Sequence, residues 1–108
     1  MPKHDVPQGT LELMILTIVN RGPIHGYGIA QRLAAMSKGV FLVNAGSLFP
    51  MLYKLEQDGL LKATWDSTEN NRQAKYYRLT RAGKRKLEKE ERWWSQVVQA
   101  ISGVLEGA

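Results

Sequence analysis

The spacing of the apolar residues changes twice along this chain of 108 residues, and that change limits the folds open to it. From residue 11 to residue 59 apolar side chains recur every three or four positions, as on one face of an α-helix. Between residues 61 and 79 they alternate with polar ones, which is typical of half-buried strands. Helical spacing then returns and persists to residue 105. The sequence therefore predicts a helical part, a pair of strands and a long final helix.

Breaks within the first part divide it into three helices. The first begins at Leu11 and ends before the segment NRGP, in which Gly22 and Pro23 stop a helix. The second runs from about His25 to Ser37. The third covers NAGSLFPMLYKLEQDG, residues 44–59, and ends at a glycine suited to the left-handed C-terminal position.

Pro50 lies within the third predicted helix, where a proline removes a main-chain hydrogen bond. With Ser47 as the N-cap, Pro50 falls in the first turn, where its missing N–H has no intrahelical partner to lose. With Asn44 as the N-cap, Pro50 lies one turn further in and kinks the helix or loosens its first turn. We favour Asn44, because the apolar connector before the helix ends at Val43.

The strands read LLKATWD and AKYYRL, and the polar run DSTENNRQ joins them into a β-hairpin. Tyr76 and Tyr77 point to opposite faces of the second strand, so one belongs to the core and the other is partly exposed. Thr80 suits the N-cap of the last helix. Three helices, a hairpin and a helix make a mainly α fold with a small β-hairpin, the winged helix-turn-helix. In that fold the third helix enters the major groove, and the hairpin, called the wing, lies along the phosphate backbone or minor groove.

The last helix has apolar residues that step by four and three in turn, with Glu91 as the one polar exception. This is the spacing of a coiled-coil seam. The first helix has apolar side chains on two faces. The two helices either cover each other within one chain or are buried between two chains, and we favour the second arrangement. The predicted dimer interface consists of Leu13, Leu16, Leu87, Trp94, Val98, Ile101 and Leu105.

Positive charge is concentrated in the middle of the chain. The net charge is +5, and residues 60–86 hold eight of the fifteen basic side chains but only two of the ten acidic ones. Such a field is expected of a nucleic-acid-binding protein, although a solvated basic face has the same composition. Because the block coincides with the predicted wing and the turn after it, charge and topology together favour DNA binding.

Composition also argues against several classes of protein. The absence of cysteine excludes disulfides, thiolate zinc sites and cysteine nucleophiles. His4 and His25 are the only histidines, so a metal-dependent enzyme is not expected, and we interpret His25 as a structural hydrogen-bonding residue. No catalytic motif stands out, so we predict no enzyme, no metal and no cofactor. The N-terminus lacks a signal peptide and the segment LELMILTIV is too short to span a bilayer, which predicts a cytoplasmic protein without a membrane partner.

Contacts to DNA are expected from the side of the third helix opposite its core-facing leucines. Phe49 and Pro50 suit a thymine methyl group, and Lys54 suits a phosphate or a guanine. Phe49 and Tyr53 are alternatively core residues. On the wing, Arg72 and Lys75 are the expected phosphate or minor-groove contacts. The predicted DNA-binding residues are Asn44, Ser47, Phe49, Pro50, Tyr53, Lys54, Arg72 and Lys75.

Four segments carry a resemblance to a known family: GTLELMILTIV, GPIHGYGIAQRL, GSLFPMLYKLEQDGLL and KYYRLTRAGKRKL. In order and spacing they resemble the PadR family of bacterial transcriptional regulators, over roughly residues 8–105. The single helix after the hairpin resembles the compact subfamily. Relatives commonly have tyrosine where this chain has Phe49, and often threonine in place of Ser47. A phosphate contact through that phenolic hydroxyl is therefore not implied here.

The resemblance implies a homodimeric transcriptional regulator, and repression is implied by the resemblance alone. A two-fold dimer presents its recognition helices about 34–36 Å apart, so we expect a pseudo-palindromic operator. Residues 1–79 are then the DNA-binding domain and residues 80–108 the dimerisation helix. The alternative function is a winged-helix protein-interaction module without sequence-specific DNA binding.

Trp93 and Trp94 are the candidates for binding an effector. In multidrug-sensing relatives a tryptophan of the last helix stacks planar ligands, which implies an aromatic or drug-like small molecule. Interface packing is the other role for these side chains, and we favour it because aromatic residues dominate interface energetics in general.

Overall fold

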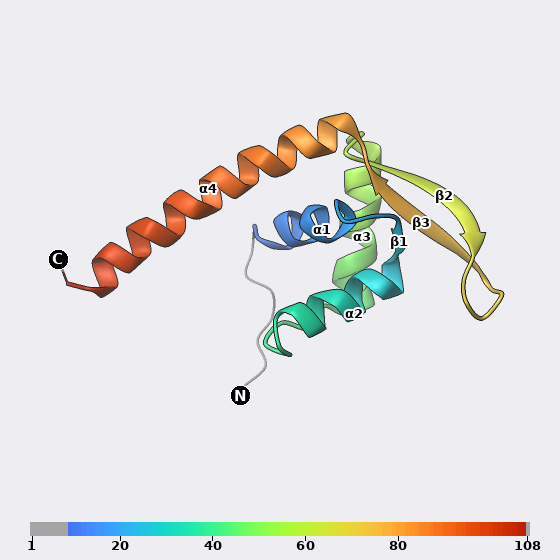
Figure 1. Ribbon diagram of the computed structural model, residues 1–108, viewed down its shortest axis with the longest axis horizontal. Coiled ribbons are helices and arrows are strands. Elements are labelled where there is room, and N and C mark those ends of the chain that lie inside the picture. The colour runs from blue at the N-terminus through green and yellow to red at the C-terminus, as the bar shows by residue number, and fades with distance from the viewer. Residues whose placement is uncertain (1–8, 108) are drawn as a thin grey trace.

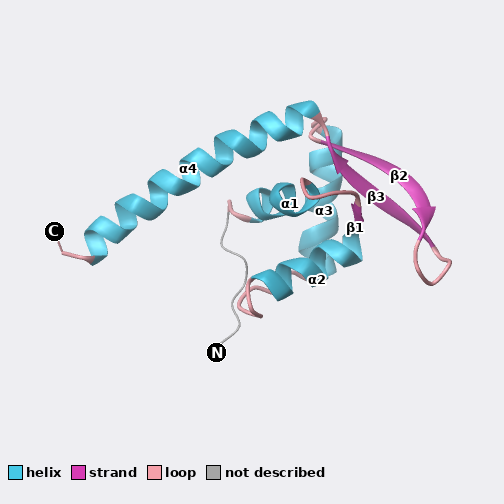
Figure 2. Ribbon diagram, in the orientation of Figure 1, coloured by secondary structure: helices cyan, strands magenta, loops and turns pink. Residues whose placement is uncertain are grey.

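The computed structural model describes residues 9–107, so the predictions for the N-terminal segment and for His4 lie outside the described residues. Three short helices form a compact group, from which the hairpin and the last helix extend in different directions (Figures 1 and 2). The elements in chain order are α1 (Leu11–Val19), β1 (Ile24–His25), α2 (Gly26–Met36), α3 (Ala45–Gln57), β2 (Leu61–Ser67), β3 (Gln73–Leu79) and α4 (Arg81–Leu105). This is the predicted winged helix-turn-helix, mainly α with a small β-sheet.

The sheet has one strand more than the sequence predicts. β2 and β3 form the expected antiparallel hairpin, with Leu61 opposite Leu79 and Ser67 opposite Gln73. β1 pairs with the other edge of β3, which gives the order β1-β3-β2. At two residues, β1 is too short to show any alternation of apolar and polar side chains, so sequence periodicity could not find it.

Helix α1 lies at the centre of the core and packs against α2, α4 and β3. This corrects the prediction for Leu16, one of the two leucines on its second apolar face, as a contact to another subunit. Leu16 is fully buried and Leu13 is 8% exposed, because other elements of the same chain surround the helix. Leu87 of α4 is likewise buried in this core. Leu16 and Leu87 therefore offer no surface to a partner, and at the start of α4 the alternative of packing within one chain is the correct one.

The N-cap of α3 is Asn44, as we favoured. Its side-chain oxygen accepts a hydrogen bond from the Ser47 N–H at 2.9 Å. Pro50 therefore lies in the second turn, and the helix nevertheless continues without interruption to Gln57. The carbonyl that loses its partner at this point is that of Gly46, an exposed residue, so water can replace the missing donor.

The start of α4 is held against the domain by two residues. The Thr80 hydroxyl accepts a hydrogen bond from the Gly83 N–H at 2.9 Å, as expected of an N-cap, and donates one to the Gly59 carbonyl at 2.7 Å. Gly83 is buried where a Cβ would collide with the main-chain carbonyl of Leu60. Towards its C-terminal end the helix extends away from the other helices, as Figure 1 shows. No helix within residues 9–107 combines the length and apolarity needed to cross a membrane.

Candidate nucleic-acid interface

The outer face of α3 follows directly from its helical spacing. Leu48, Leu52 and Leu55 are buried, as predicted, so the residues on the opposite side face solvent. Tyr53 is 63% exposed, which rules out the interpretation of this residue as core. Gln57, four residues later, is also exposed on this face. The sequence analysis missed Gln57, although continuing the helical spacing from Tyr53 would have found it.

Phe49 combines the two roles that the sequence left open. Its ring covers Gly26 at the start of α2, where a Cβ would lie 2.7 Å from the ring atom Cε1. The side chain is nevertheless 49% exposed. Gly26 therefore allows α2 to approach α3 closely, while part of the Phe49 ring stays available at the surface.

A groove of about 810 Å³ separates α3 from the wing. Phe49 and Tyr53 line it from α3, and Arg72 and Lys75 line it from the wing. Two further aromatic side chains that the sequence analysis did not single out, Tyr27 and Trp65, also line it and are 69% and 68% exposed. Because Tyr27, Tyr53 and Trp65 each carry a polar hydrogen at the end of an apolar ring, such a groove suits both sugars and phosphates.

Lys75, a predicted phosphate or minor-groove contact, forms an ion pair within the chain. Its Nζ lies 2.7 Å from Oε1 of Glu56 on α3, and 5.8 Å from the centre of the Tyr77 ring. The hydrogen bond to Glu56 raises the pKa of Lys75 above its usual 10.5. Both side chains are about one-third exposed, so the pair is partly shielded from water. The contact ties β3 to α3 and thereby links the wing to the recognition helix.

Arg72 differs from Lys75 in having its charge free. Within residues 9–107 no carboxylate forms an ion pair with its guanidinium, and the residue is exposed. Asn71 precedes it in the left-handed conformation, with φ 59°, as a tight turn requires. Hydrogen bonds between Thr68 and Arg72 close this turn, the shorter at 2.7 Å. Arg72 is thus a free cation on an ordered wing tip.

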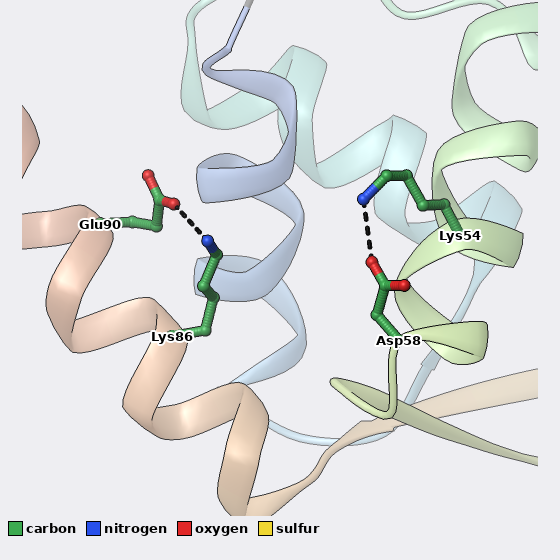
Figure 3. A network of polar contacts seen from close by, with 4 residues as sticks. All are labelled: Lys54, Asp58, Lys86 and Glu90. Carbon is green, nitrogen blue, oxygen red and sulfur yellow. Dashed lines mark hydrogen bonds and ion pairs between the residues drawn. The ribbon is translucent and has the colours of Figure 1, made fainter.

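Lys54 lies on the other flank of α3, away from the wing. Its Nζ bonds Asp58 at 2.8 Å, and that hydrogen bond raises its pKa, with a smaller contribution from Glu12 of α1. Figure 3 shows this pair on one side of α1 and the pair Lys86–Glu90 of α4 on the other. The pair of Lys54 with Asp58, the residue after the end of α3, is exposed and spans four positions, so it is weak and easily exchanged for a phosphate.

The remaining predicted positions divide between surface and core. Asn44, Ser47 and Pro50 are exposed in the first two turns of α3.

His25 has the structural role predicted for it, because its Nδ1 accepts a hydrogen bond from the Gly28 N–H at 2.9 Å and caps α2. Tyr77 is buried and Tyr76 is half-exposed, so the two tyrosines lie on opposite faces as expected.

The two tryptophans of α4 have different surroundings. Trp94 lines an apolar groove of about 410 Å³ between α1, α2 and α4, together with Leu13 and the carboxylate of Glu91. Trp93 does not line this groove, although its ring centre is 6.4 Å from that of Trp94. Both are more than 40% exposed. Of the two tryptophans, therefore, Trp94 is the one that borders this groove in the described part of the chain, residues 9–107.

Comparison with known proteins agrees with this geometry. The model of the "Transcriptional regulator PadR-like family" matches residues 15–89. The crystal structure of a PadR-like transcriptional regulator from Bacillus cereus is similar, with 27% identity and a TM-score of 0.82 over 94% of this chain and 96% of that one. A PadR family regulator from Eggerthella lenta has 32% identity and a TM-score of 0.79, covering 94% and 86%. A transcriptional regulator of Mycobacterium tuberculosis is 29% identical over 93% of this chain and 90% of its own length.

These relatives are described as regulators of transcription, and the fold and the surface around α3 and the wing fit that role. The chain therefore belongs to the PadR-like family of transcriptional regulators, which act by binding DNA and are not enzymes.

Proposed function

We propose that this protein is a homodimeric repressor that binds a pseudo-palindromic operator with α3 in the major groove and the wing beside it. The observation that supports this most is the outer face of α3. It is covered by no other element of the described chain, residues 9–107, and the wing, whose tip carries the unpaired Arg72, borders it across the groove. Two such surfaces related by a two-fold axis would read half-sites one helical turn apart.

On α3, the proposed contacts divide by chemistry. Phe49 and Pro50 present apolar surface to a thymine methyl group, whereas Ser47 and the hydroxyl of Tyr53 donate to phosphates or base edges. The amide nitrogen of Asn44 is available for the same purpose, because only its oxygen is used in the cap. Lys54 contributes a charge at the far flank of the helix.

On the wing, we assign different roles to the two cations. Arg72 contacts a phosphate or enters the minor groove, since its charge is free. Lys75 positions the wing through its ion pair with Glu56 and is not itself a phosphate contact. Tyr27, at the start of α2, adds a hydroxyl donor on the other side of the groove.

The proposed dimer interface is the exposed apolar stripe of α4, which consists of Trp94, Val98, Ile101 and Leu105. Leu13 stays in this interface because it lines the groove beside Trp94. We retain residues 1–79 as the DNA-binding domain and residues 80–108 as the dimerisation helix. The first two turns of that helix serve both parts, because Gly83 and Leu87 are packed into the domain.

The groove at Trp94 supports an aromatic or drug-like small molecule as the effector class. Its walls are apolar apart from a few polar groups, among them Glu91. Binding there would favour a dimer geometry whose recognition helices no longer match the half-site spacing.

Titration of aromatic cations into the protein–operator complex should quench tryptophan fluorescence and release the operator DNA in parallel. Trp94→Phe should abolish both effects, whereas Trp93→Phe should retain the release.

The operator itself is tested by measuring affinity for a fragment of the protein's own promoter between about 50 and 200 mM salt. Specific binding should exceed that to random DNA by a factor of about 10³ or more.

Arg72→Ala should lower the slope of log K against log salt by about 0.9, as expected when one phosphate-binding charge is removed. The double substitution Glu56→Gln with Lys75→Gln removes one charge of each sign. It should weaken DNA binding and leave the slope of log K against log salt unchanged. Arg92→Ala, on α4, is the matched control and should change neither the affinity nor the slope. Equal affinity for promoter and random fragments would instead favour the protein-interaction module.

A further inference from the structure

A second group of cations lies at the base of the wing, away from the surface described above. We call them the wing-base cations, and they consist of Lys62, Arg78, Arg81, Lys84 and Arg85. All five are exposed. Three other lysines, Lys54, Lys75 and Lys86, form ion pairs, but within residues 9–107 no carboxylate pairs with any wing-base cation. The molecule therefore leaves this group uncompensated.

Two of these cations face each other directly across the hairpin. Lys62 on β2 is the register partner of Arg78 on β3. Like charges directly opposite in an antiparallel pair destabilise it. Next to them in register, Leu61 and Leu79 pack into or against the core. The strands cannot shift by one residue without turning these leucines outward, so the two charges are held together.

The other three cations occupy the first two turns of α4. The N-terminus of a helix is the positive end of its dipole, where acidic side chains are favourable and basic ones are not. The first turn of α4 has no acidic residue and begins with Arg81, followed by Lys84 and Arg85. Glu88 lies one turn after Lys84 but forms no ion pair with it. This is a second unfavourable electrostatic arrangement, and only Leu79 and Thr80 separate it from the first along the chain.

Both arrangements become favourable when an anion with several charges lies on them. A nucleic-acid duplex is such a ligand, with one phosphate charge for about each 1.7 Å of its axis. A protein partner would need apolar or aromatic anchors at the centre of its contact. Among the apolar side chains next to these cations in sequence or register, Leu61 and Leu87 are buried and Leu79 is partly buried against the core, while Tyr76 is partly buried on the strand before Arg78. The surface is therefore suited to phosphates and poorly suited to a protein partner.

The wing base is also too far from the wing tip to contact the same phosphates. Arg72 and Arg78 are six residues apart along β3 and its turn, which corresponds to about 20 Å. Figure 1 shows the start of α4 and the turn of the hairpin at opposite ends of the wing. We propose that the wing-base cations bind phosphates of duplex DNA outside the half-site contacted by α3. The inference rests on the proposed operator binding and extends the footprint beyond it.

The test compares two lengths of duplex DNA. A duplex of about 20 base pairs covers two half-sites one turn apart, and a second duplex of twice that length carries flanking sequence on both sides. The wild-type protein should bind the longer duplex more tightly and with a steeper salt dependence. The variants Lys62→Gln with Arg78→Gln, and Arg81→Gln with Lys84→Gln and Arg85→Gln, should lose most of that gain. For every phosphate-binding cation that a variant removes, the slope of log K against log salt should fall in magnitude by about 0.9.

A second measurement separates a phosphate-binding role from a structural one. Without DNA, Lys62→Gln should raise the melting temperature by about 1–4 °C, because it removes a repulsion between opposite strand positions. A cation that supports the fold would instead lower it. The control Arg92→Gln removes one exposed charge from α4 and should leave both the length dependence and the melting temperature unchanged.

Each result decides the inference. The inference is wrong if both variants still bind the longer duplex more tightly than the short one, to the same extent as the wild-type protein. If the wild-type protein binds the short duplex in that case, the proposed function stands. A lower melting temperature for Lys62→Gln removes its electrostatic basis. Failure of the wild-type protein to bind either duplex overturns the proposed function and the inference together.

Discussion

The apolar stripe of α4 begins at Leu87 and runs to Leu105, and its two ends differ in what covers them. Near the start, Gly83 and Leu87 are buried in the domain. From residue 91 to residue 107 no side chain is buried, and Ile101 and Leu105 are 53% and 80% exposed. A regular apolar stripe therefore specifies that a helix has a face to bury, and the tertiary structure specifies how much of that face its own chain buries.

The difference has a simple physical consequence. The first end is held by contacts and a cap within the chain, so substitutions there should act on folding. The second end leaves its apolar face exposed, and helices in water owe most of their stability to packing of such a face. Substitutions there should act on association and leave the folded domain intact.

The largest effect is expected from adding one methyl group at Gly83. In Gly83→Ala the new Cβ would collide with the Leu60 carbonyl and the Leu79 side chain, so the free energy of unfolding should fall by about 3 kcal/mol or more. Gly103→Ala makes the same change at the exposed end, where a Cβ meets nothing within 4 Å. It should raise stability by about 0.5–1 kcal/mol. Urea unfolding measures both, and equal shifts would show that the two ends do not differ.

The next effect is on association. Ile101→Glu places a charge in the exposed stripe and should weaken dimerisation by about 2–4 kcal/mol, which sedimentation equilibrium would detect as a lower mean mass. Gln99→Glu adds the same charge on the opposite side of the helix and should leave the mass unchanged. If the Ile101 variant remains fully dimeric, this stripe is not the interface.

A smaller effect is expected at the cap. Thr80→Ala removes the acceptor for the Gly83 N–H and the hydrogen bond to Gly59, and should cost about 1–2 kcal/mol in thermal unfolding. Thr80→Ser keeps the hydroxyl and should recover most of the loss. A loss that serine does not recover would mean that the methyl group, and not the cap, is what matters.

The smallest effect concerns Lys86, whose hydrogen bond to Glu90 raises its pKa above the usual 10.5. A lysine with a raised pKa in the folded state stabilises the fold fully below about 10.5, and this stabilisation is lost as the pH rises through the raised value. Lys86→Gln should therefore cost about 0.3–0.5 kcal/mol near neutral pH and nothing at high pH, with the difference reduced by salt. A pH-independent effect would point to packing of the lysine stem instead.

The sequence by itself determined the local structure of this protein. The change from helical to alternating spacing located four helices and a hairpin. Residue type and position indicated Thr80 as an N-cap and favoured Asn44 over Ser47 as the other, and the structure has both Asn44 and Thr80 as N-caps. These features depend on neighbours a few residues away, so a linear pattern contains the needed information. The buried leucines of α3 follow from the same patterns.

Only the tertiary structure decided which distant residues meet. Lys75 is paired with Glu56, nineteen residues away, and no spacing rule distinguishes it from the unpaired Arg72. The same holds for the burial of Leu16 and Leu87, for the pairing of β1 with β3, and for the place of Tyr27 beside α3. Such contacts depend on how whole elements pack, because a residue's partner is set by the surface that another element brings to it.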